Sequence, residues 1–300
     1  MTFRHLAWWT AETSGVAIRS RARGLGCLLF LLALAVPLAG FGSIESLFAP
    51  SKKLWPRWTT NDPASTARID HSAWSAVLQK YLSTDAGGIN RFAYAKVTRE
   101  DRQALGAYLD RLAATPISRY DRAEQRAFWI NLYNALTVAL VLDHYPVKSI
   151  RDIDISPGLF SVGPWDKDLV TVEGERLTLN DIEHRILRPI WNDPRIHYAV
   201  NCASVGCPNL RATAFTGENA DLLMEAGARE FVNSPRGVWL TAGRLIVSSI
   251  YAWFTDDFGG TEQGVIEHLR RYAGPALGAQ LARVTRIDGD AYDWRLNDAP

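Results

Sequence analysis

The sequence predicts a single globular domain of the α+β (mixed α/β) class, in which several helices pack against a small, mostly antiparallel sheet. Three observations predict this class. Long stretches between residues 66 and 145 carry apolar side chains at the spacing of amphipathic helices. Short alternating runs flank tight turns at 173–175 and 242–243, as in β-hairpins. Finally, 300 residues of which 47% are hydrophobic are enough for a substantial core.

Composition limits the classes of partner and scaffold. The formal net charge is +1, so no overall field attracts nucleic acid, and we expect no nucleic-acid partner. Three cysteines are too few for a scaffold held by disulfides. Eleven tryptophans predict an aromatic-rich core or a stacking surface. We expect no cofactor, and the composition leaves the oligomeric state open.

The N-terminal region predicts a membrane-directed segment. Residues 25–38 are uncharged and almost wholly apolar, and Arg19, Arg21 and Arg23 precede them. Basic residues before an apolar run keep the N-terminus inside and send the following chain across the membrane. Residues 25–44 are either a cleaved signal peptide or an uncleaved anchor in contact with the membrane. In both cases we expect the globular part to be extracytoplasmic, in the periplasm.

These features divide the chain into a basic segment (1–24), the signal or anchor segment (25–44), a linker (45–65) and the globular domain (66–300). The linker is predicted because its prolines lie among polar residues. Within the domain we expect the first two helices over 66–81 and 101–113, both with an apolar side.

Residues 121–145 form the strongest predicted helix. Its stretch 128–142 is apolar nearly all round, which is typical of a central, buried helix. Asn131 and Asn134 lie three residues apart on neighbouring parts of one face. A buried amide must find partners or cost about 1–3 kcal/mol. The two amides therefore either hold nearby loops or line a site.

A helix over 179–190 contains the clearest misfit in the chain. Thr178 and Asp181 before and within its first turn resemble a capping box. Glu183 falls inside the apolar stripe of this helix, and His184 lies at the edge of the stripe. A buried carboxylate is costly unless it is paired or protonated. Glu183 is therefore either a structural carboxylate locked to an arginine or to backbone amides, or a functional carboxylate in a cleft.

The stretch RIHYAVNCASVGCPNL, residues 195–210, is where we first expect chemistry. Its first seven residues alternate as in a strand, with His197 and Asn201 on the same face. The strand leads into a loop that contains Cys202 and Cys207, two of the three cysteines. A polar strand face that ends in a cysteine loop is a candidate reactive site.

The remaining predicted elements are short. They are a hairpin around 173–175, a helix over 222–232, strands over 238–240 and 244–247, an aromatic segment over 250–258 and a helix over 263–272. Asp256 and Asp257 end the aromatic segment and are expected to cap or turn the chain. The tail is expected to dock Tyr292 and Trp294 on the core.

Five motifs resemble, in order, the DUF547 family of unknown function: AFWINLYNALTVALVLDHYP, LNDIEHRILRP, DPRIHYAVNCASVGCPNL, YAWFTDDFG and YDWRLN. The resemblance covers residues 73–297, is to extracytoplasmic bacterial-type members, and implies one domain with a shared core. It implies little about activity. The motif positions kept by this chain are Asn131, Asn134, Glu183, His184, His197, Asn201, Cys202, Cys207 and Pro208. The chain departs from the family at 88–96, where GINRFAYAK replaces a Val-Asp-Tyr type of strand.

The first hypothesis for the site is a thiol-dependent hydrolase or transferase of the cell envelope. Its nucleophile would be Cys202 or Cys207 and its base His197 or His184. The orienting group would be Asn201, Asn134 or Glu183. On a regular strand His197 and Cys202 point to opposite faces, so that pair requires a turn at Cys202.

Two other hypotheses stay open. In one, Cys202 and Cys207 form a disulfide, as nearby thiols do outside the cytoplasm. The domain is then a non-catalytic binding or structural module whose aromatic, Asn-lined cleft takes a peptide or glycan. In the other, His184, His197, Glu183 and a cysteine bind zinc. The tight ligand spacing of such sites is missing, and we expect no metal.

Overall fold

The structure, a computed structural model, describes residues 49–158 and 162–300. The predicted signal or anchor segment lies outside the described residues. Within the described residues, no helix combines the length and the apolar character needed to span a membrane. The described residues belong to one compact unit.

Helices dominate this unit, and the predicted α+β class is confirmed. The α-helices of the described residues are α1 (Ser72–Tyr81), α2 (Arg99–Ala113), α3 (Arg122–His144), α4 (Arg188–Trp191), α5 (Ala220–Val232), α6 (Ser249–Trp253), α7 (Glu262–Tyr272) and α8 (Pro275–Leu281). Five of them correspond to predicted helices, α1, α2, α3, α5 and α7. The helix predicted over 66–81 begins only at Ser72.

The strands form three small sheets. They are β1 (Leu82–Thr84) with β2 (Asn90–Phe92), β3 (Val170–Val172) with β4 (Glu175–Leu177), and β5 (Val238–Thr241) with β6 (Arg244–Ser248) and β7 (Gly289–Ala291). All pairs are antiparallel except β6–β7. The predicted hairpins are confirmed: Glu173, Gly174, Ala242 and Gly243 all have positive φ, as the tight turns of hairpins require.

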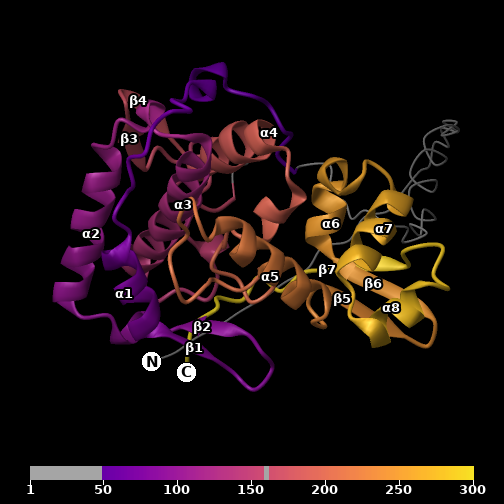
Figure 1. Cartoon of the computed structure of the whole chain (residues 1–300). Helices are drawn as coiled ribbons and strands as arrows, with labels where there is room; N and C mark the ends of the chain where they lie inside the picture. Colours follow the sequence, from indigo (N-terminus) through magenta and orange to yellow (C-terminus); the bar gives the residue numbers. More distant parts are fainter. Residues whose placement is uncertain (1–48, 159–161) are drawn as a thin grey trace, which may run out of the picture. The chain divides into compact units, whose positions relative to one another are not determined.

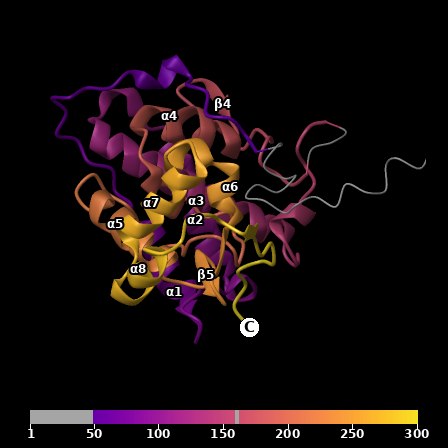
Figure 2. The same ribbon diagram turned by 90° about the vertical axis from the view of Figure 1, so that its right-hand side faces the viewer.

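The unit has two hydrophobic clusters. Figure 1 shows α1–α4 gathered in one part and the β5–β6–β7 sheet with α6–α8 in another, with α5 between them. In Figure 2 the second part faces the viewer, and α6 and α7 lie in front of α3. The first cluster includes Phe128 and Trp129 of α3, and the second includes Tyr251 and Phe258.

Helix α3 is the centre of the first cluster, as predicted. The Asp121 side chain caps it by accepting a hydrogen bond from the Glu124 N–H at 2.8 Å. Every residue from Glu124 to Val138 is buried. A helix that is enclosed on all sides gives its polar side chains no access to bulk water, so each of them must find a partner inside the protein.

The predicted strand over 195–201 is wrong. Residues Pro194–Tyr198 form a 3₁₀ helix, which begins with a proline and is capped by Asp193, whose Oδ1 accepts from the Arg195 N–H at 2.9 Å. Both faces of this segment are buried, so the alternation of residue types indicated no sheet face. The expected opposition of His197 and Cys202 on one strand therefore does not arise.

The predicted helix over 179–190 is present but differs in its winding. Residues Asp181–Leu187 form a π-helix, and α4 continues it. The predicted capping box is confirmed, because Thr178 and Asp181 exchange side-chain and backbone hydrogen bonds at 3.0 Å. The wider turn changes the angular positions expected from α-helical spacing, and π-helical turns often occur at functional sites.

From residue 49 onward, the predicted linker 45–65 is bound to the rest of the domain. The backbone N–H groups of Lys53 and Trp55 donate to the carbonyls of His184 and Arg185, both at 3.0 Å. Trp58 is buried against Trp129, with the ring centroids 5.0 Å apart. This segment is part of the domain because its aromatic side chains are buried in the core, which a proline count does not reveal.

Candidate active site

A pocket of about 910 Å³, here called the main pocket, lies between α3 and α6. Glu183, His197 and Cys202, which come from three separate elements, all line it. The other lining residues that the sequence singled out are His184, Cys207 and Pro208, and the aromatic ones are Tyr133, Trp165, Trp253, Phe254, Tyr292 and Trp294. The structure therefore brings the carboxylate helix and the cysteine loop to one cavity.

His197 lies between two carboxylates. Its Nε2 donates to Asp257 Oδ2 at 2.7 Å, and its Nδ1 faces Glu183 Oε1 at 3.6 Å. The ring stacks on Phe254 with a centroid distance of 4.6 Å and an interplanar angle of 13°. Two carboxylates and one ring face fix the imidazole in position and orientation, which is how a third group orients a catalytic base.

Two cations hold Asp257 in turn. Arg188 Nε donates to Asp257 Oδ2 at 2.5 Å, and Lys52 Nζ lies 2.9 Å from Oδ1. The side chains of Asp257 and Arg188 are 7% and 3% exposed, so this is a buried charge network. Burial opposes the charge of Asp257, but His197 and Arg188 outweigh it and hold the pKa of this carboxyl well below its usual range.

Glu183 is an ionised carboxylate in the wall of the pocket. Burial opposes its charge, but attraction to His184, His197 and Arg188 lowers its pKa to about 2. Burial lowers the pKa of His184 to about 4, so this imidazole is neutral at pH 7. The Arg188 guanidinium donates to His184 Nδ1 at 2.9 Å. Because His184 is neutral at pH 7 and Arg188 is always charged, the positive charge that favours the ionised form of Glu183 comes from Arg188 and not from His184.

The cysteine loop is held in an uncommon conformation. Ala203, directly after Cys202, has φ of 60°. A non-glycine residue in the left-handed region costs about 1–3 kcal/mol and persists where its surroundings impose it. Asn201 Oδ1 accepts from the Ala203 N–H at 2.8 Å. A Cβ on Gly206 would come within 2.8 Å of the Asp293 nitrogen, so glycine permits the C-terminal segment to pack on the loop.

The C-terminal segment places one hydroxyl between two sulfurs. The Tyr292 hydroxyl lies 3.1 Å from Cys202 Sγ and 3.1 Å from Cys207 Sγ. The Cys202 N–H also donates to Cys207 Sγ at 3.0 Å, and Cys202 Sγ lies 3.4 Å from Ser204 Oγ. Both cysteines are free thiols in the structure, so the predicted disulfide is not formed.

The two thiols differ in exposure and in acidity. Cys202 is partly exposed and Cys207 is buried. Hydrogen bonds with Cys207, Ser204 and Tyr292 lower the pKa of Cys202 against the effect of burial. Burial and the bond to Cys202 raise the pKa of Cys207 well above its usual value. Because the thiolate is the reactive form, Cys202 is the reactive sulfur of the pair.

Three tryptophans and Tyr292 form an aromatic wall on one side of the main pocket. Trp253 stacks on Trp294 with the ring centroids 5.5 Å apart, and Tyr292 lies 4.6 Å from Trp294. Trp165 meets Trp294 edge-on at 5.8 Å. The predicted docking of Tyr292 and Trp294 on the core is confirmed.

The segment that supplies Tyr133, Glu183, His197 and both thiols matches a known protein family. Residues 117–232 match the family described as "Protein of unknown function, DUF547". This chain carries a DUF547 domain. No curated protein and no solved structure matches the chain significantly. The match is shorter than the 73–297 expected.

The matched segment does not contain the whole site of this DUF547 domain. Lys52 lies before it, and Asp257 and Tyr292 lie after it. The motifs YAWFTDDFG and YDWRLN, which supply the last two, are outside the match. The buried charge network and the hydroxyl between the sulfurs are therefore completed by chain on both sides of the DUF547 segment.

The side-chain amides of the three asparagines in the DUF547 segment form hydrogen bonds with backbone groups. Asn131 exchanges two hydrogen bonds with Phe215, at 2.8 and 3.0 Å. Asn134 donates to the Ala199 carbonyl at 2.9 Å and accepts from the Asn201 N–H at 2.8 Å. Asn201 donates to the Pro208 carbonyl at 2.8 Å. The amides of Asn134 and Asn201 fix the cysteine loop and its approach, that of Asn131 holds the chain at Phe215, and none of the three lines the main pocket.

Three contributors to the site were not singled out from the sequence, namely Lys52, Tyr133 and Arg188, and Tyr292 was noticed only as a residue that docks the tail. Asp257 was noticed only as a cap or turn residue. Tyr133 lines the pocket. Burial raises its pKa well above 10, and the charges of Glu183 and both sulfurs raise it further. The one usable signal was the position of Tyr133 between Asn131 and Asn134 on the central helix.

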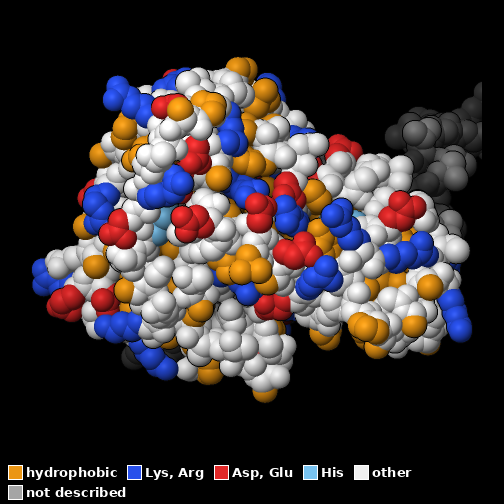
Figure 3. Space-filling view, in the orientation of Figure 1, with side chains coloured by type: hydrophobic (Ala, Val, Ile, Leu, Met, Phe, Trp, Pro, Cys, Tyr) orange, Lys and Arg blue, Asp and Glu red, His pale blue; other side chains and the backbone are white. Residues whose placement is uncertain are grey.

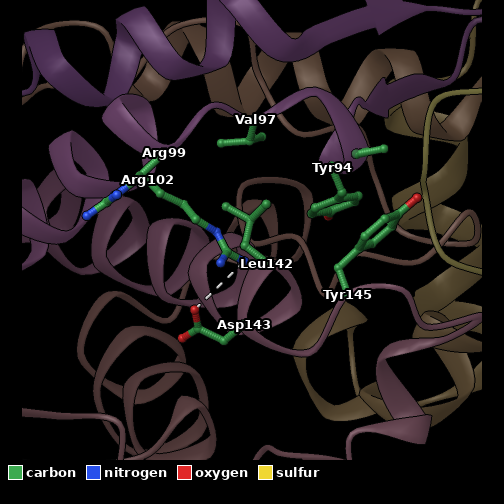
Figure 4. Close-up of a pocket in the computed structure, with 8 residues that line it drawn as sticks. Tyr94, Val97, Arg99, Arg102, Leu142, Asp143 and Tyr145 are labelled. Carbon is green, nitrogen blue, oxygen red and sulfur yellow. Dashed lines mark ion pairs between the residues drawn. The ribbon is translucent and has the colours of Figure 1, made fainter.

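Other places in the DUF547 domain offer less chemistry. Among the described residues, no group of three or more His, Cys, Asp or Glu side chains is arranged to hold a metal ion. A second hollow of about 520 Å³ lies over α2 and the end of α3 (Figure 4), where Arg102 and Asp143 form a loose ion pair at 3.9 Å. It is lined by no cysteine, serine or histidine. On the face in Figure 3, acidic and basic side chains are interspersed.

Proposed function

We propose that this DUF547 domain is a cysteine-dependent hydrolase or transferase with Cys202 as its nucleophile. One observation carries the proposal: the partly exposed thiol of Cys202 lines the same pocket as the Glu183–His197–Asp257 array. A nucleophile and an oriented acid–base group in one cavity are the two requirements of covalent acyl transfer.

The sulfur side supplies the nucleophile. Tyr292 and Ser204 place hydroxyl groups 3.1 and 3.4 Å from Cys202 Sγ, and the Cys207 thiol is a further neighbour. Donors around a sulfur stabilise its thiolate, which is the form that attacks carbonyl carbon. The strained residue Ala203 next to Cys202 adds a conformational feature that is common in active sites.

The opposite side supplies the acid and base. His197 donates through Nε2 to Asp257, its Nδ1 faces Glu183, and Glu183 lines the pocket. Asp257 is the orienting group, a role that the sequence assigned to asparagines or Glu183. Tyr133 lines the same pocket as Glu183 and Cys202, and we assign its hydroxyl the transfer of a proton between the two sides.

The reaction has two steps. The Cys202 thiol first gives its proton to the Glu183–His197 side. The resulting thiolate attacks the carbonyl carbon of an ester, thioester or amide, and a carbon–sulfur bond forms. The bond to the leaving group breaks, and the leaving group takes a proton from the Glu183–His197 side. Water or an acceptor alcohol or amine then gives its proton to the same side, attacks the acyl group and releases the thiolate. The aromatic wall favours substrates with an apolar acyl group.

The test uses p-nitrophenyl butyrate as a generic apolar acyl donor. We expect full-length protein to release p-nitrophenol and to carry a butyryl group on Cys202, which peptide mass spectrometry detects. The Cys202→Ala variant is expected to lose both signals, and Glu183→Gln is expected to slow the release. A Cys202→Ala variant that is folded and as active as the wild type would remove the proposal.

The alternative is a non-catalytic module that binds a peptide or glycan. The observation that favours it is the aromatic wall of Trp165, Trp253 and Trp294, because such rings stack on sugars and on aromatic side chains. Titration of tryptophan fluorescence with chito-oligosaccharides and with a random peptide pool tests it. Saturable quenching in the Cys202→Ala variant, without acyl transfer by the wild type, supports binding over catalysis.

We also propose that the domain works outside the cytoplasm, in the envelope, through the N-terminal segment 25–44. The support is the basic residues before the apolar run. A reporter enzyme that is active only after export, fused to the C-terminus, is expected to be active. Activity only for a reporter that requires the cytoplasm contradicts this location.

A further inference from the structure

We propose that Cys202 and Cys207 form a reversible thiol–disulfide pair, oxidised by hydroperoxides, that switches the Cys202 nucleophile off and on. The switching of activity rests on the proposed function, whereas the formation of the bond does not. The inference differs from a permanent structural disulfide, because both sulfurs are free in the structure.

The first step is proximity. One atom, the Tyr292 hydroxyl oxygen, lies 3.1 Å from each sulfur. The Cys202 backbone nitrogen lies 3.0 Å from Cys207 Sγ, so the second sulfur already rests against the residue that carries the first. Gly206, beside Cys207, packs closely against the C-terminal segment, and its N–H donates to the Asp293 carbonyl at 2.8 Å.

The second step is the asymmetry of the two thiols. Cys202 faces the pocket and is partly exposed, so a small oxidant reaches it first. Cys207 is 5% exposed and has little contact with solvent. The lowered pKa of Cys202, caused by its hydrogen bonds, agrees with this order. An accessible, acidic thiol beside a buried one is the arrangement of an attacking cysteine and a resolving cysteine.

The chemistry balances with hydrogen peroxide as the oxidant. The Cys202 thiolate attacks one oxygen of the peroxide, the oxygen–oxygen bond breaks, and the products are Cys202 sulfenic acid and hydroxide, which is protonated to water. Cys207 sulfur then attacks the sulfenic sulfur, the sulfur–oxygen bond breaks, and the thiol proton leaves with the hydroxide as a second water. Two thiols lose two hydrogens in total, and an external dithiol restores them.

The structural consequence is local. A bond between the sulfurs removes the nucleophile and takes away the thiols that the Tyr292 hydroxyl contacts. The charge network at Asp257 is formed with Lys52 and Arg188, neither of which belongs to the cysteine loop, so it keeps its partners. We therefore expect oxidation to stop acyl transfer without unfolding the domain.

The test treats reduced full-length protein with an excess of hydrogen peroxide, followed by denaturation, alkylation with iodoacetamide and non-reducing peptide mapping. We expect loss of both thiols, a peptide pair linked through Cys202 and Cys207, and recovery of both thiols with dithiothreitol. In Cys207→Ser we expect no link and sulfinic acid at Cys202. In Cys202→Ser we expect Cys207 to stay alkylatable.

The wild-type map decides the proposal even where a variant does not fold. Sulfinic acid at Cys202 with Cys207 still alkylatable, or a link to Cys27 instead, overturns it. Ester hydrolysis measured on the same samples separates the two proposals. If the Cys202–Cys207 link forms but the reduced protein does not hydrolyse the ester, the thiol–disulfide pair is supported and the proposed function is contradicted. If the reduced protein hydrolyses the ester but peroxide forms no link, the proposed function is supported and the thiol–disulfide pair is contradicted.

Discussion

Asp257 Oδ2 accepts a hydrogen bond from His197 Nε2 at 2.7 Å, although the two residues are 60 positions apart in the chain. This bond joins the two hydrophobic clusters at the main pocket and leaves His197 Nδ1 facing Glu183. It also assigns Asp257 the orienting role in the site. Because Asp257 is 7% exposed at its side chain and meets two cations, the same bond is important for stability.

We predict that Asp257→Asn lowers the free energy of unfolding by about 3–5 kcal/mol, because it leaves Arg188 buried without its counter-charge. Urea unfolding measures the change. The neighbouring Asp256 is exposed, so Asp256→Asn serves as the matched control and is expected to change the free energy by less than about 0.5 kcal/mol. Equal effects of the two substitutions contradict the buried network.

Lys52 offers a second test of the network. Its ammonium pairs with Asp257 Oδ1 and is 27% exposed at the side chain. Since partial exposure weakens an ion pair, we predict that Lys52→Met costs about 1 kcal/mol. Lys53→Met is the control, because Lys53 is exposed. If Lys52→Met is as stable as Lys53→Met, the segment before α1 does not contribute to the charge balance of the site.

The pH dependence of stability follows from three buried histidines. Burial lowers the pKa of His71, His184 and His268 from 6.5 to about 4. Between these values the unfolded chain binds more protons than the folded chain, so the free energy of unfolding falls as the pH falls from 6.5 to 4. Each histidine contributes a slope of up to about 1.4 kcal/mol per pH unit.

Glu183 extends this loss to lower pH. Its pKa is lowered from 4.5 to about 2, so its contribution is complete above 4.5 and declines as the pH falls to 2. Urea unfolding at pH 7, 6, 5, 4 and 3 tests both ranges. A free energy of unfolding that stays constant from pH 6.5 to 4 shows that the three histidines are protonated in the folded state.

The sequence predicted the elements that depend on local pattern. The helix centred on Phe128, the hairpin turns at Gly174 and Gly243 and the burial of Glu183 all follow from periodicity and turn chemistry, which act over a few residues. The winding at Glu183 and the 3₁₀ helix at His197 did not follow, because both segments are buried, so the pattern of residue types does not mark a face turned toward solvent.

The partners in the site could be predicted only in part. Asp257 with His197, Lys52 with Asp257, and Tyr292 with the cysteines are contacts across long stretches of chain, and no local pattern identifies such pairs. Asn134 shows the converse: an amide in an apolar helix suggests a site, yet its partners are the Ala199 carbonyl and the Asn201 N–H.

We therefore predict that Asn134→Ala is a stability variant. It leaves two buried backbone groups without partners and should cost about 1–3 kcal/mol for each. The remaining folded protein should alkylate at Cys202 at the rate of the wild type. Thermal unfolding and iodoacetamide labelling measure the two effects. Loss of labelling in a fully stable variant would instead place Asn134 in the chemistry.

The most direct test of the account is the pH dependence of alkylation of Cys202 and Cys207 by iodoacetamide in folded, reduced protein, resolved by peptide mapping. The account predicts that Cys202 reacts first, with an apparent pKa below the ordinary value of about 8.5, and that Tyr292→Phe raises this pKa while Tyr120→Phe does not. Cys207 should react only on unfolding. Equal rates for the two cysteines, or no reaction of Cys202 before unfolding, contradict a nucleophile in the main pocket.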